Sequence, residues 1–227
     1  MKREVWILSF FFFFFFAAEL CARTDSTYYN GTLDHRLQVG LYSIYKTEHA
    51  EIVMLGNSLT HGVNWNELLG RTDIAERGIP GDGIRDYLSR MQYVYRLKPK
   101  ICFIMGGIND LYSGYPPELI SANYIKVVEA LKENGIIPVM QSPLYVASQY
   151  MLAPKKNQEI TTLNNLLKTY AEKKGILFID LNSKMSRGGF LRSELTFDGI
   201  HLNADGYLIW RDEIAPVINR LLEPGSR

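Results

Sequence analysis

Residues 51–62 of this 227-residue chain read EIVMLGNSLTHG, and this stretch indicates the fold class. Its first half is a short apolar run that ends at Gly56, which is the profile of a buried strand that stops at a turn. Similar apolar runs recur at residues 73–79, 101–105, 136–141 and 176–181. The pattern predicts a buried strand for each of these runs.

Segments with a helical pattern separate the predicted strands. They cover residues 84–97, 117–134, 158–174 and about 203–222, and a weaker pattern covers residues 35–45. Gly135 and Gly175 follow two of these segments and can take the left-handed conformation that closes a helix. Strands that alternate with helices of this length form a parallel sheet with right-handed crossovers. The sequence therefore predicts an α/β fold: a single doubly wound, flavodoxin-like domain with a five-stranded parallel sheet and helices on both faces.

The composition is that of an ordinary globular protein, with 47% apolar and 22% charged residues. The 25 Lys and Arg residues are balanced by 24 Asp and Glu residues. With so little surplus of positive charge, the chain is a poor partner for a phosphate backbone, and we expect no nucleic acid ligand. Two cysteines cannot build a dense disulfide framework, so stability is expected to come from a hydrophobic core.

The first 22 residues have a different character. Lys2 and Arg3 precede an apolar stretch at residues 5–18 that contains an unbroken phenylalanine run, and small residues follow it. This is typical of a secretory signal peptide, and the apolar stretch is shorter than the roughly 20 residues of a spanning helix. We expect residues 1–22 to be a leader and residues 23–227 the exported, periplasmic or extracellular, domain without a membrane span. A lipid anchor at Cys21 is the less favoured alternative.

In a doubly wound sheet, chemistry collects at the carboxyl ends of the strands, and polar segments lie at four such positions. Ser58 follows the first strand, where a neighbouring base could activate its hydroxyl, although a serine in such a turn is more often a helix cap. Gly81 lies in RGIPGDG, residues 77–83, after the second strand. Its backbone N–H could bind an oxyanion, and a plain tight turn is the alternative.

Of the other two segments, one follows the third strand and the other precedes the last helix. Asn109, in MGGIND at residues 105–110, offers uncharged N–H donors to an oxyanion or bonds its own backbone in a turn. Asp198 lies three residues before His201, where a carboxylate can fix the tautomer and orientation of a histidine that acts as a base.

Metal ligation is the rival interpretation of that histidine. The other histidines of the chain are scattered, at His35, His49 and His61. The sequence therefore predicts no metal site and no cofactor.

Together, the four segments resemble the SGNH hydrolases, the GDSL-type esterase and lipase family, over about residues 51–210. In that resemblance Ser58 matches the nucleophile, Gly81 the oxyanion glycine, Asn109 the oxyanion asparagine, and Asp198 with His201 the Asp-x-x-His motif. The resemblance implies a serine esterase with a Ser-His-Asp triad. Its oxyanion hole would consist of the backbone N–H groups of Ser58 and Gly81 and the Asn109 side chain.

The chain departs from the family pattern at Asn57, where the family has an aspartate. Asparagine keeps the size and hydrogen-bonding capacity of that side chain but removes its charge. We expect local stability and the protonation of His201 to differ from the family for this reason, and the enzyme to remain active.

An exported protein of this size resembles the carbohydrate O-acetylesterases of the family, which include sialate and plant-polysaccharide deacetylases, and its acetylhydrolase branch. Tyr112, Tyr115, Tyr145 and Tyr150 fall in loops where they could stack on sugar rings, or simply pack on the core. The expected substrate is an acyl ester of a small molecule or glycan, with acetyl as the acyl group. The alternatives are a lysophospholipase or thioesterase, and a catalytically idle carbohydrate-binding protein. The sequence does not indicate an oligomeric state.

Overall fold

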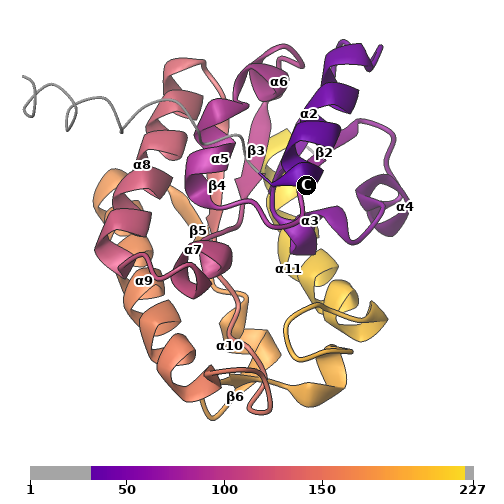
Figure 1. Cartoon of the computed structure of the whole chain (residues 1–227). Helices are drawn as coiled ribbons and strands as arrows, with labels where there is room; N and C mark the ends of the chain where they lie inside the picture. Colours follow the sequence, from indigo (N-terminus) through magenta and orange to yellow (C-terminus); the bar gives the residue numbers. More distant parts are fainter. Residues whose placement is uncertain (1–31, 223–227) are drawn as a thin grey trace, which may run out of the picture. The chain divides into compact units, whose positions relative to one another are not determined.

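The computed structural model describes residues 32–222 (Figure 1). The expected leader at residues 1–22 and the expected start of the domain at residue 23 lie outside this part of the chain. Within residues 32–222, no helix has the length and apolar character needed to cross a membrane.

The predicted parallel sheet is confirmed. It consists of β1 (Ile52–Gly56), β2 (Ile74–Gly78), β3 (Ile101–Ile104), β4 (Ile137–Gln141) and β5 (Leu177–Ile179). The strand order is β2-β1-β3-β4-β5, the doubly wound order in which the switch point lies between β1 and β3. Because β1 is next to both β2 and β3, the loops that follow these three strands meet at one place on the carboxyl edge.

Each predicted helical segment contains a helix, but the bounds differ from those predicted, and further short helices are present. The longer ones are α2 (Leu33–Ile44), α5 (Ile84–Ser89), α8 (Pro117–Glu133), α9 (Ala153–Lys174) and α11 (Ala204–Leu222). Short helices and turns also occur at α3 (Ser58–His61), α4 (Trp65–Leu69), α6 (Gln92–Tyr95), α7 (Ile108–Tyr112), α10 (Asn182–Met185) and η1 (Ser193–Leu195). A two-stranded hairpin of β6 (Ser186–Arg187) and β7 (Phe190–Leu191) precedes η1.

Helices cover both faces of the sheet, as predicted, and each face has its own hydrophobic core. Alternate residues of β1 point to opposite faces, so that Val53 and Leu55 join the core formed with α5, α6, α8 and α9. Ile52 and Met54 join the core formed with α3, α4, α10 and α11. Every residue of β1 is buried, which explains why the strand is continuously apolar rather than alternating.

Aromatic packing fixes α11 on the sheet. Trp65 and Trp210 meet edge to face, with ring centroids 4.9 Å apart, and the indole N–H of Trp210 donates to Gln141 Oε1 at 2.6 Å. The Tyr207 hydroxyl donates to the Leu59 carbonyl at 2.8 Å. These contacts tie α11 to α3, and they place the loop that precedes α11 beside the loop that follows β1.

Candidate active site

Ser58 is the first residue of α3, directly after β1. Asn57 caps this short helix, and its Oδ1 accepts the Leu59 N–H at 3.1 Å. At Gly78 of β2, a Cβ atom would lie 2.6 Å from the His61 nitrogen and 2.8 Å from the Asn57 carbonyl oxygen. A glycine at this position therefore lets α3 pack directly on the end of β2, and the serine is held in a crowded, well-defined turn.

His201 links Ser58 to Asp198 in a continuous hydrogen-bonded chain. Its Nε2 lies 3.0 Å from Ser58 Oγ, and its Nδ1 donates to Asp198 Oδ2 at 2.6 Å. With the proton on Nδ1, Nε2 is free to accept the serine hydroxyl proton. The structure thus brings together three residues that the sequence places up to 143 positions apart.

The turn at residues 198–201 holds this geometry from the backbone side. Asp198 Oδ1 accepts the N–H groups of Ile200 at 2.9 Å and His201 at 2.7 Å, and Gly199 takes a positive φ of 98°. Thr196 Oγ1 accepts the Gly199 N–H and donates to the His201 carbonyl. Partial burial raises the pKa of Asp198, but the hydrogen bonds from His201 and Ile200 outweigh it and lower the pKa below its usual value. The carboxylate is therefore charged at neutral pH and can orient the imidazole.

Gly81 lies on the loop that follows β2, and Asn109 is the second residue of α7, in the connection that follows β3. The strands β2 and β3 lie on either side of β1. Gly81 has a φ of 81°, a left-handed conformation that favours glycine. Within residues 32–222 its backbone N–H makes no hydrogen bond. The Asn109 amide donates to the Asp82 carbonyl at 2.9 Å, so the two loops are bonded to each other. The amide has a second N–H, which can point to a ligand.

The tyrosines that the sequence suggested for substrate binding are in different environments. The Tyr112 hydroxyl donates to the Met151 carbonyl, and its ring packs edge-on against Tyr150. Tyr115 is 39% exposed. The Tyr145 hydroxyl is bonded to Thr161, in a polar cavity of about 250 Å³ whose lining residues include neither Ser58 nor His201. Tyr112 and Tyr145 thus have structural partners, and the structure does not place Tyr145 in a common cavity with the serine.

Phe197 is the aromatic residue that the sequence interpretation missed. Its ring stacks on the His201 ring, with centroids 5.9 Å apart and planes at 16°, and the residue is 73% exposed. An aromatic residue immediately before the Asp-x-x-His segment was the available signal. Its exposure could not be read from the sequence because it depends on the turn at residues 196–202.

One group of metal-ligating side chains exists within the described residues, formed by His35, Asp82 and Asp86. Their ligand atoms lie within 4.8 Å of one another. Arg90 Nε already donates to Asp82 Oδ2 at 2.8 Å, and Asp86 Oδ2 accepts the Gly83 N–H at 2.8 Å. A guanidinium in contact with Asp82 opposes a second cation, so we do not assign a metal to this group.

The buried thiol of Cys102 has a raised pKa because of desolvation, which does not suit a nucleophile.

Comparison with known proteins identifies related chains. The model of the GDSL-like lipase/acylhydrolase family matches residues 54–209. The isoamyl acetate-hydrolyzing esterase of Saccharomyces cerevisiae is 27% identical over 171 residues, which cover 67% of this chain and 71% of the yeast protein. The N-acylneuraminate cytidylyltransferase of Streptococcus agalactiae serotype V is 29% identical over 119 residues. That match covers 49% of this chain and only 28% of the streptococcal enzyme.

The fold is also found among solved structures. A GDSL-like lipase from Bacteroides thetaiotaomicron superposes with a TM-score of 0.73 and 24% sequence identity. The superposition covers 82% of this chain and 98% of the bacterial protein. The similarity therefore extends over nearly the whole of that protein's fold.

Proposed function

The chain belongs to the GDSL-like lipase/acylhydrolase family, and on this premise we propose that it is a carboxylic ester hydrolase with Ser58, His201 and Asp198 as its catalytic triad. The observation that carries the proposal is the hydrogen-bonded chain from Ser58 Oγ through His201 to Asp198 Oδ2, with distances of 3.0 and 2.6 Å. A hydroxyl within reach of an imidazole that is itself oriented by a carboxylate is the arrangement that nucleophilic acyl transfer requires.

In the proposed acylation step, Ser58 Oγ attacks the ester carbonyl while His201 Nε2 takes the hydroxyl proton. The negative charge that develops on the carbonyl oxygen is stabilised by the backbone N–H groups of Ser58 and Gly81 and by the Asn109 amide. The protonated His201 then gives its proton to the departing alcohol, and the acyl group remains on Ser58. Asp198 stays charged throughout and stabilises the imidazolium.

In the second step water hydrolyses the acyl-enzyme. His201, neutral again, takes a proton from the water molecule as it attacks the acyl carbonyl carbon. The same N–H donors hold the oxyanion, and the proton returns to Ser58 Oγ as the carboxylic acid leaves. The enzyme is regenerated without any cofactor in these steps.

We further propose that the acyl group is acetyl and that the alcohol is a carbohydrate. The yeast relative is named for hydrolysis of an acetate ester, and the streptococcal relative is named for a sialic acid, N-acylneuraminate. Phe197 supports a sugar substrate because an exposed aromatic ring beside the proposed catalytic histidine can stack on the apolar face of a pyranose. Sialic acid and plant polysaccharides are both candidate carriers of the acetyl group.

The triad is tested with Ser58→Ala in the purified protein. We expect loss of at least a thousandfold in kcat on 4-nitrophenyl acetate, with an unchanged circular dichroism spectrum. A fluorophosphonate probe should label the wild-type serine and leave the variant unlabelled. Full esterase activity of the variant would show that Ser58 is not the nucleophile.

The substrate class is tested by measuring acetate release from acetylated sialic acid, xylan fragments and pectin fragments, alongside 4-nitrophenyl acetate and octanoate. Preference for acetate, together with release from one of the glycans, is expected. Preference for octanoate would instead favour a lysophospholipase or thioesterase. Acetate release from the nitrophenyl ester but from no glycan would contradict the carbohydrate part of the proposal.

We also propose that the protein is exported, on the strength of residues 1–22 alone. Mass spectrometry of the N-terminus, after expression of the full chain in a secreting host, tests this directly. Cleavage after Ala18 or Ala22 is expected. An intact N-terminus on protein retained in the cytoplasm would contradict export.

A further inference from the structure

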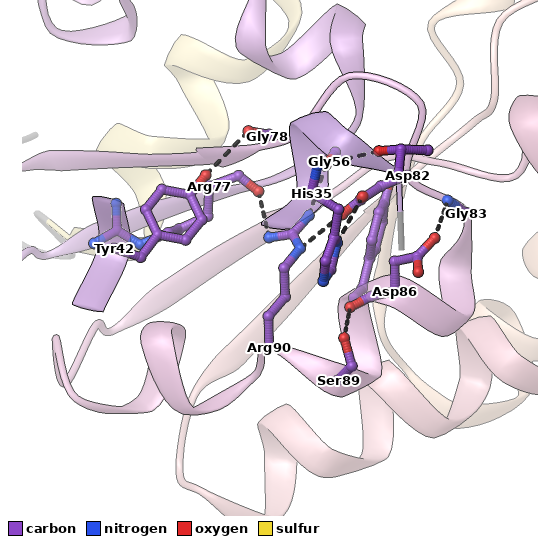
Figure 2. Close-up of polar contacts among 12 residues, drawn as sticks. His35, Tyr42, Gly56, Arg77, Gly78, Asp82, Gly83, Asp86, Ser89 and Arg90 are labelled. Atoms are coloured by element: carbon purple, nitrogen blue, oxygen red, sulfur yellow. Dashed lines mark hydrogen bonds and ion pairs between the residues drawn. The ribbon is translucent and has the colours of Figure 1, made fainter. Parts of the chain in front are cut away.

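Asp82, next to the proposed oxyanion residue Gly81, carries a fully buried carboxylate that is held from two sides. Arg90 Nε donates to Asp82 Oδ2 at 2.8 Å, and His35 Nδ1 lies 2.9 Å from Asp82 Oδ1 (Figure 2). Arg90 is the residue that directly follows α5, whereas His35 lies in the first turn of α2. Two elements far apart in the sequence therefore meet at one carboxylate.

Arg90 ties this carboxylate to the strand ends that carry the site. Its side chain is 1% exposed, and its Nη1 and Nη2 donate to the carbonyl oxygens of Arg77 at 2.8 Å and Gly56 at 2.9 Å (Figure 2). Gly56 is the end of β1, two residues before Ser58. The guanidinium thus fixes the position of Asp82 relative to the loop that carries the serine.

The backbone of Asp82 in turn orients the proposed oxyanion donors. Its carbonyl accepts the Asn109 amide at 2.9 Å. The next peptide is fixed as well, because the Gly83 N–H donates to Asp86 Oδ2 at 2.8 Å. A displacement of the Asp82 side chain would therefore change the direction of both the Asn109 amide and the neighbouring Gly81 N–H.

Helix α2 approaches the same loop through its first turn. A Cβ atom on Gly81 would lie 3.4 Å from Thr32 Cγ2, which is ordinary van der Waals contact. Thr32 caps α2 and accepts the His35 N–H at 3.1 Å. The His35 side chain is 13% exposed, so its contact with Asp82 is shielded from water. Shielding strengthens the interaction of the imidazole with the carboxylate.

We propose that Asp82 is a positioning residue of the oxyanion hole, held in place by Arg90 and by His35 of α2. This inference rests on the proposed function, because it takes Gly81 and Asn109 as the oxyanion donors. Neither Asp82 nor His35 touches the substrate in this scheme. They keep the donors aimed at the place where charge develops in the transition state, which is where preorganisation has its largest effect on rate.

The electrostatics of the site agree with this role. Burial raises the pKa of Asp82, while the nearby charge of Arg90 and the hydrogen bond from His35 oppose the rise. Burial without these partners would favour a neutral carboxyl group, which binds the guanidinium less strongly. Asp82→Asn would leave the buried Arg90 without its counter-ion and is expected to be strongly destabilised. His35, at the edge of the network, is therefore the better position to test.

The experiment compares His35→Ala, His35→Asn and Tyr42→Phe with the wild-type protein on 4-nitrophenyl acetate. Asparagine can present an amide N–H close to the position of His35 Nδ1, so it is the rescue variant. Tyr42 lies on the same side of α2, and its hydroxyl donates to the Gly78 carbonyl at 3.0 Å (Figure 2). Tyr42→Phe loosens α2 from β2 without touching Asp82, which makes it the matched control.

We expect His35→Ala to lower kcat about tenfold with KM within twofold of wild type. His35→Asn should restore most of kcat, and Tyr42→Phe should lower Tm while kcat stays unchanged. Unchanged kcat in His35→Ala, or a fall in kcat that Tyr42→Phe reproduces, would overturn the inference. Ser58→Ala distinguishes failure of the proposed function from failure of this inference. If Ser58→Ala stays active, Ser58 is not the nucleophile. If activity depends on Ser58 but is unchanged in His35→Ala, only the positioning role is refuted.

Discussion

Asn109 lies where its uncharged amide can donate a hydrogen bond to the oxyanion, whose negative charge develops only in the transition state. Its side chain already has one partner, the Asp82 carbonyl at 2.9 Å, which sets the direction of the remaining N–H. Asn109→Ala should lower kcat by a factor on the order of 10²–10³ with little change in KM, because the lost interaction forms with the oxyanion and not with the ground-state ester. Steady-state kinetics on 4-nitrophenyl acetate measure this.

Asn66→Ala is the matched control for that variant. The Asn66 side chain makes two hydrogen bonds to the backbone of Ile74, both at 3.0 Å, at the amino end of β2 and thus at the edge of the sheet opposite the site. Its loss should lower stability and leave kcat unchanged. If Asn109→Ala keeps kcat within about threefold of wild type, the asparagine is not an oxyanion donor.

Asn57 is the residue at which the chain departs from its family. It is fully buried, its Oδ1 caps α3, and its Nδ2 has no hydrogen-bond partner within residues 32–222. Asn57→Asp keeps the cap and adds a negative charge next to Ser58. This charge favours the protonated form of His201, which cannot act as a base.

We therefore expect the acidic limb of the pH profile of kcat/KM to move to higher pH in Asn57→Asp. Asn134→Asp, which adds the same charge at the exposed C-terminus of α8, should leave the profile unchanged. An acidic limb that does not move in Asn57→Asp would mean that the new carboxyl group is neutral or that its charge does not reach His201.

The sequence predicted a role most directly for residues whose chemistry depends on a short local motif. The spacing of Asp198 and His201 suffices to place a carboxylate on the imidazole, because both lie in one turn. His35 and Phe197 were not predicted as members of the site. His35 reaches Asp82 across 47 positions of sequence, and the role of Phe197 depends on its stacking and exposure. The contact of His35 has no local signature, and for Phe197 the position before the Asp-x-x-His segment does not reveal the exposure of the ring.

At the scale of secondary structure, Gly78 is a position where β2 and the segment of α3 pack closely. Gly78→Ala would place a methyl group against backbone atoms of His61 and Asn57, which cannot rotate away. We expect this variant to lower the free energy of unfolding by about 1–3 kcal/mol. The displacement of α3 should also reduce kcat, because Ser58 is the first residue of that helix. Urea unfolding and steady-state kinetics on the same preparation measure the two effects.

Gly40→Ala, in the interior of α2, is the contrasting substitution. A Cβ at Gly40 meets no atom within 4 Å, and alanine is the better helix former. We expect it to raise the free energy of unfolding by about 0.5–1 kcal/mol with no change in kcat. Equal effects of the two glycine substitutions would contradict the close-packing argument.

Helix bounds were predicted less accurately than the parallel sheet itself. The expected helix at residues 84–97 is interrupted between α5 and α6, where Arg90 leaves the helix and its side chain enters the buried ion pair with Asp82. The helix expected from residue 158 begins at Ala153, after Leu152 in a left-handed conformation. Side-chain periodicity shows neither event: the first accompanies the ion pair of Arg90, and the second coincides with a proline in the first turn of α9.

For the whole described part of the chain, the alternation of strands and helices was enough to predict the doubly wound sheet. A parallel sheet of mostly buried, largely apolar strands needs helices on both faces, and right-handed crossovers leave few arrangements. What this topology adds to function is position: the loops after β2, β1 and β3 are neighbours at one edge. Gly81 lies on the first of these loops, and Ser58 and Asn109 lie in the short helices that follow the other two, so the sheet gathers them although they are spread over about 50 residues of sequence.

The stability of the whole domain should depend on pH through Asp110, which lies next to Asn109 and is 5% exposed. Burial raises its pKa from 3.8 to about 6, although the Ile84 N–H donates to its carboxylate and lowers the pKa in part. In the folded state it therefore binds a proton between about pH 4 and 6, where the unfolded chain has released it. This carboxyl group consequently makes folding less favourable as pH rises through that window.

Asp110→Asn isolates this contribution, because the amide oxygen can still accept the Ile84 N–H while the buried charge is removed. We expect the variant to match wild type below about pH 4 and to be more stable above pH 6, by at most ~3 kcal/mol, which is the free energy that corresponds to the rise in pKa. Urea unfolding from pH 4 to 8 measures the difference between the two proteins, in which the carboxyl groups they share cancel. A constant difference across this range would mean that Asp110 titrates in the folded protein as it does in the unfolded chain, and that its contact with Ile84 compensates fully for its burial.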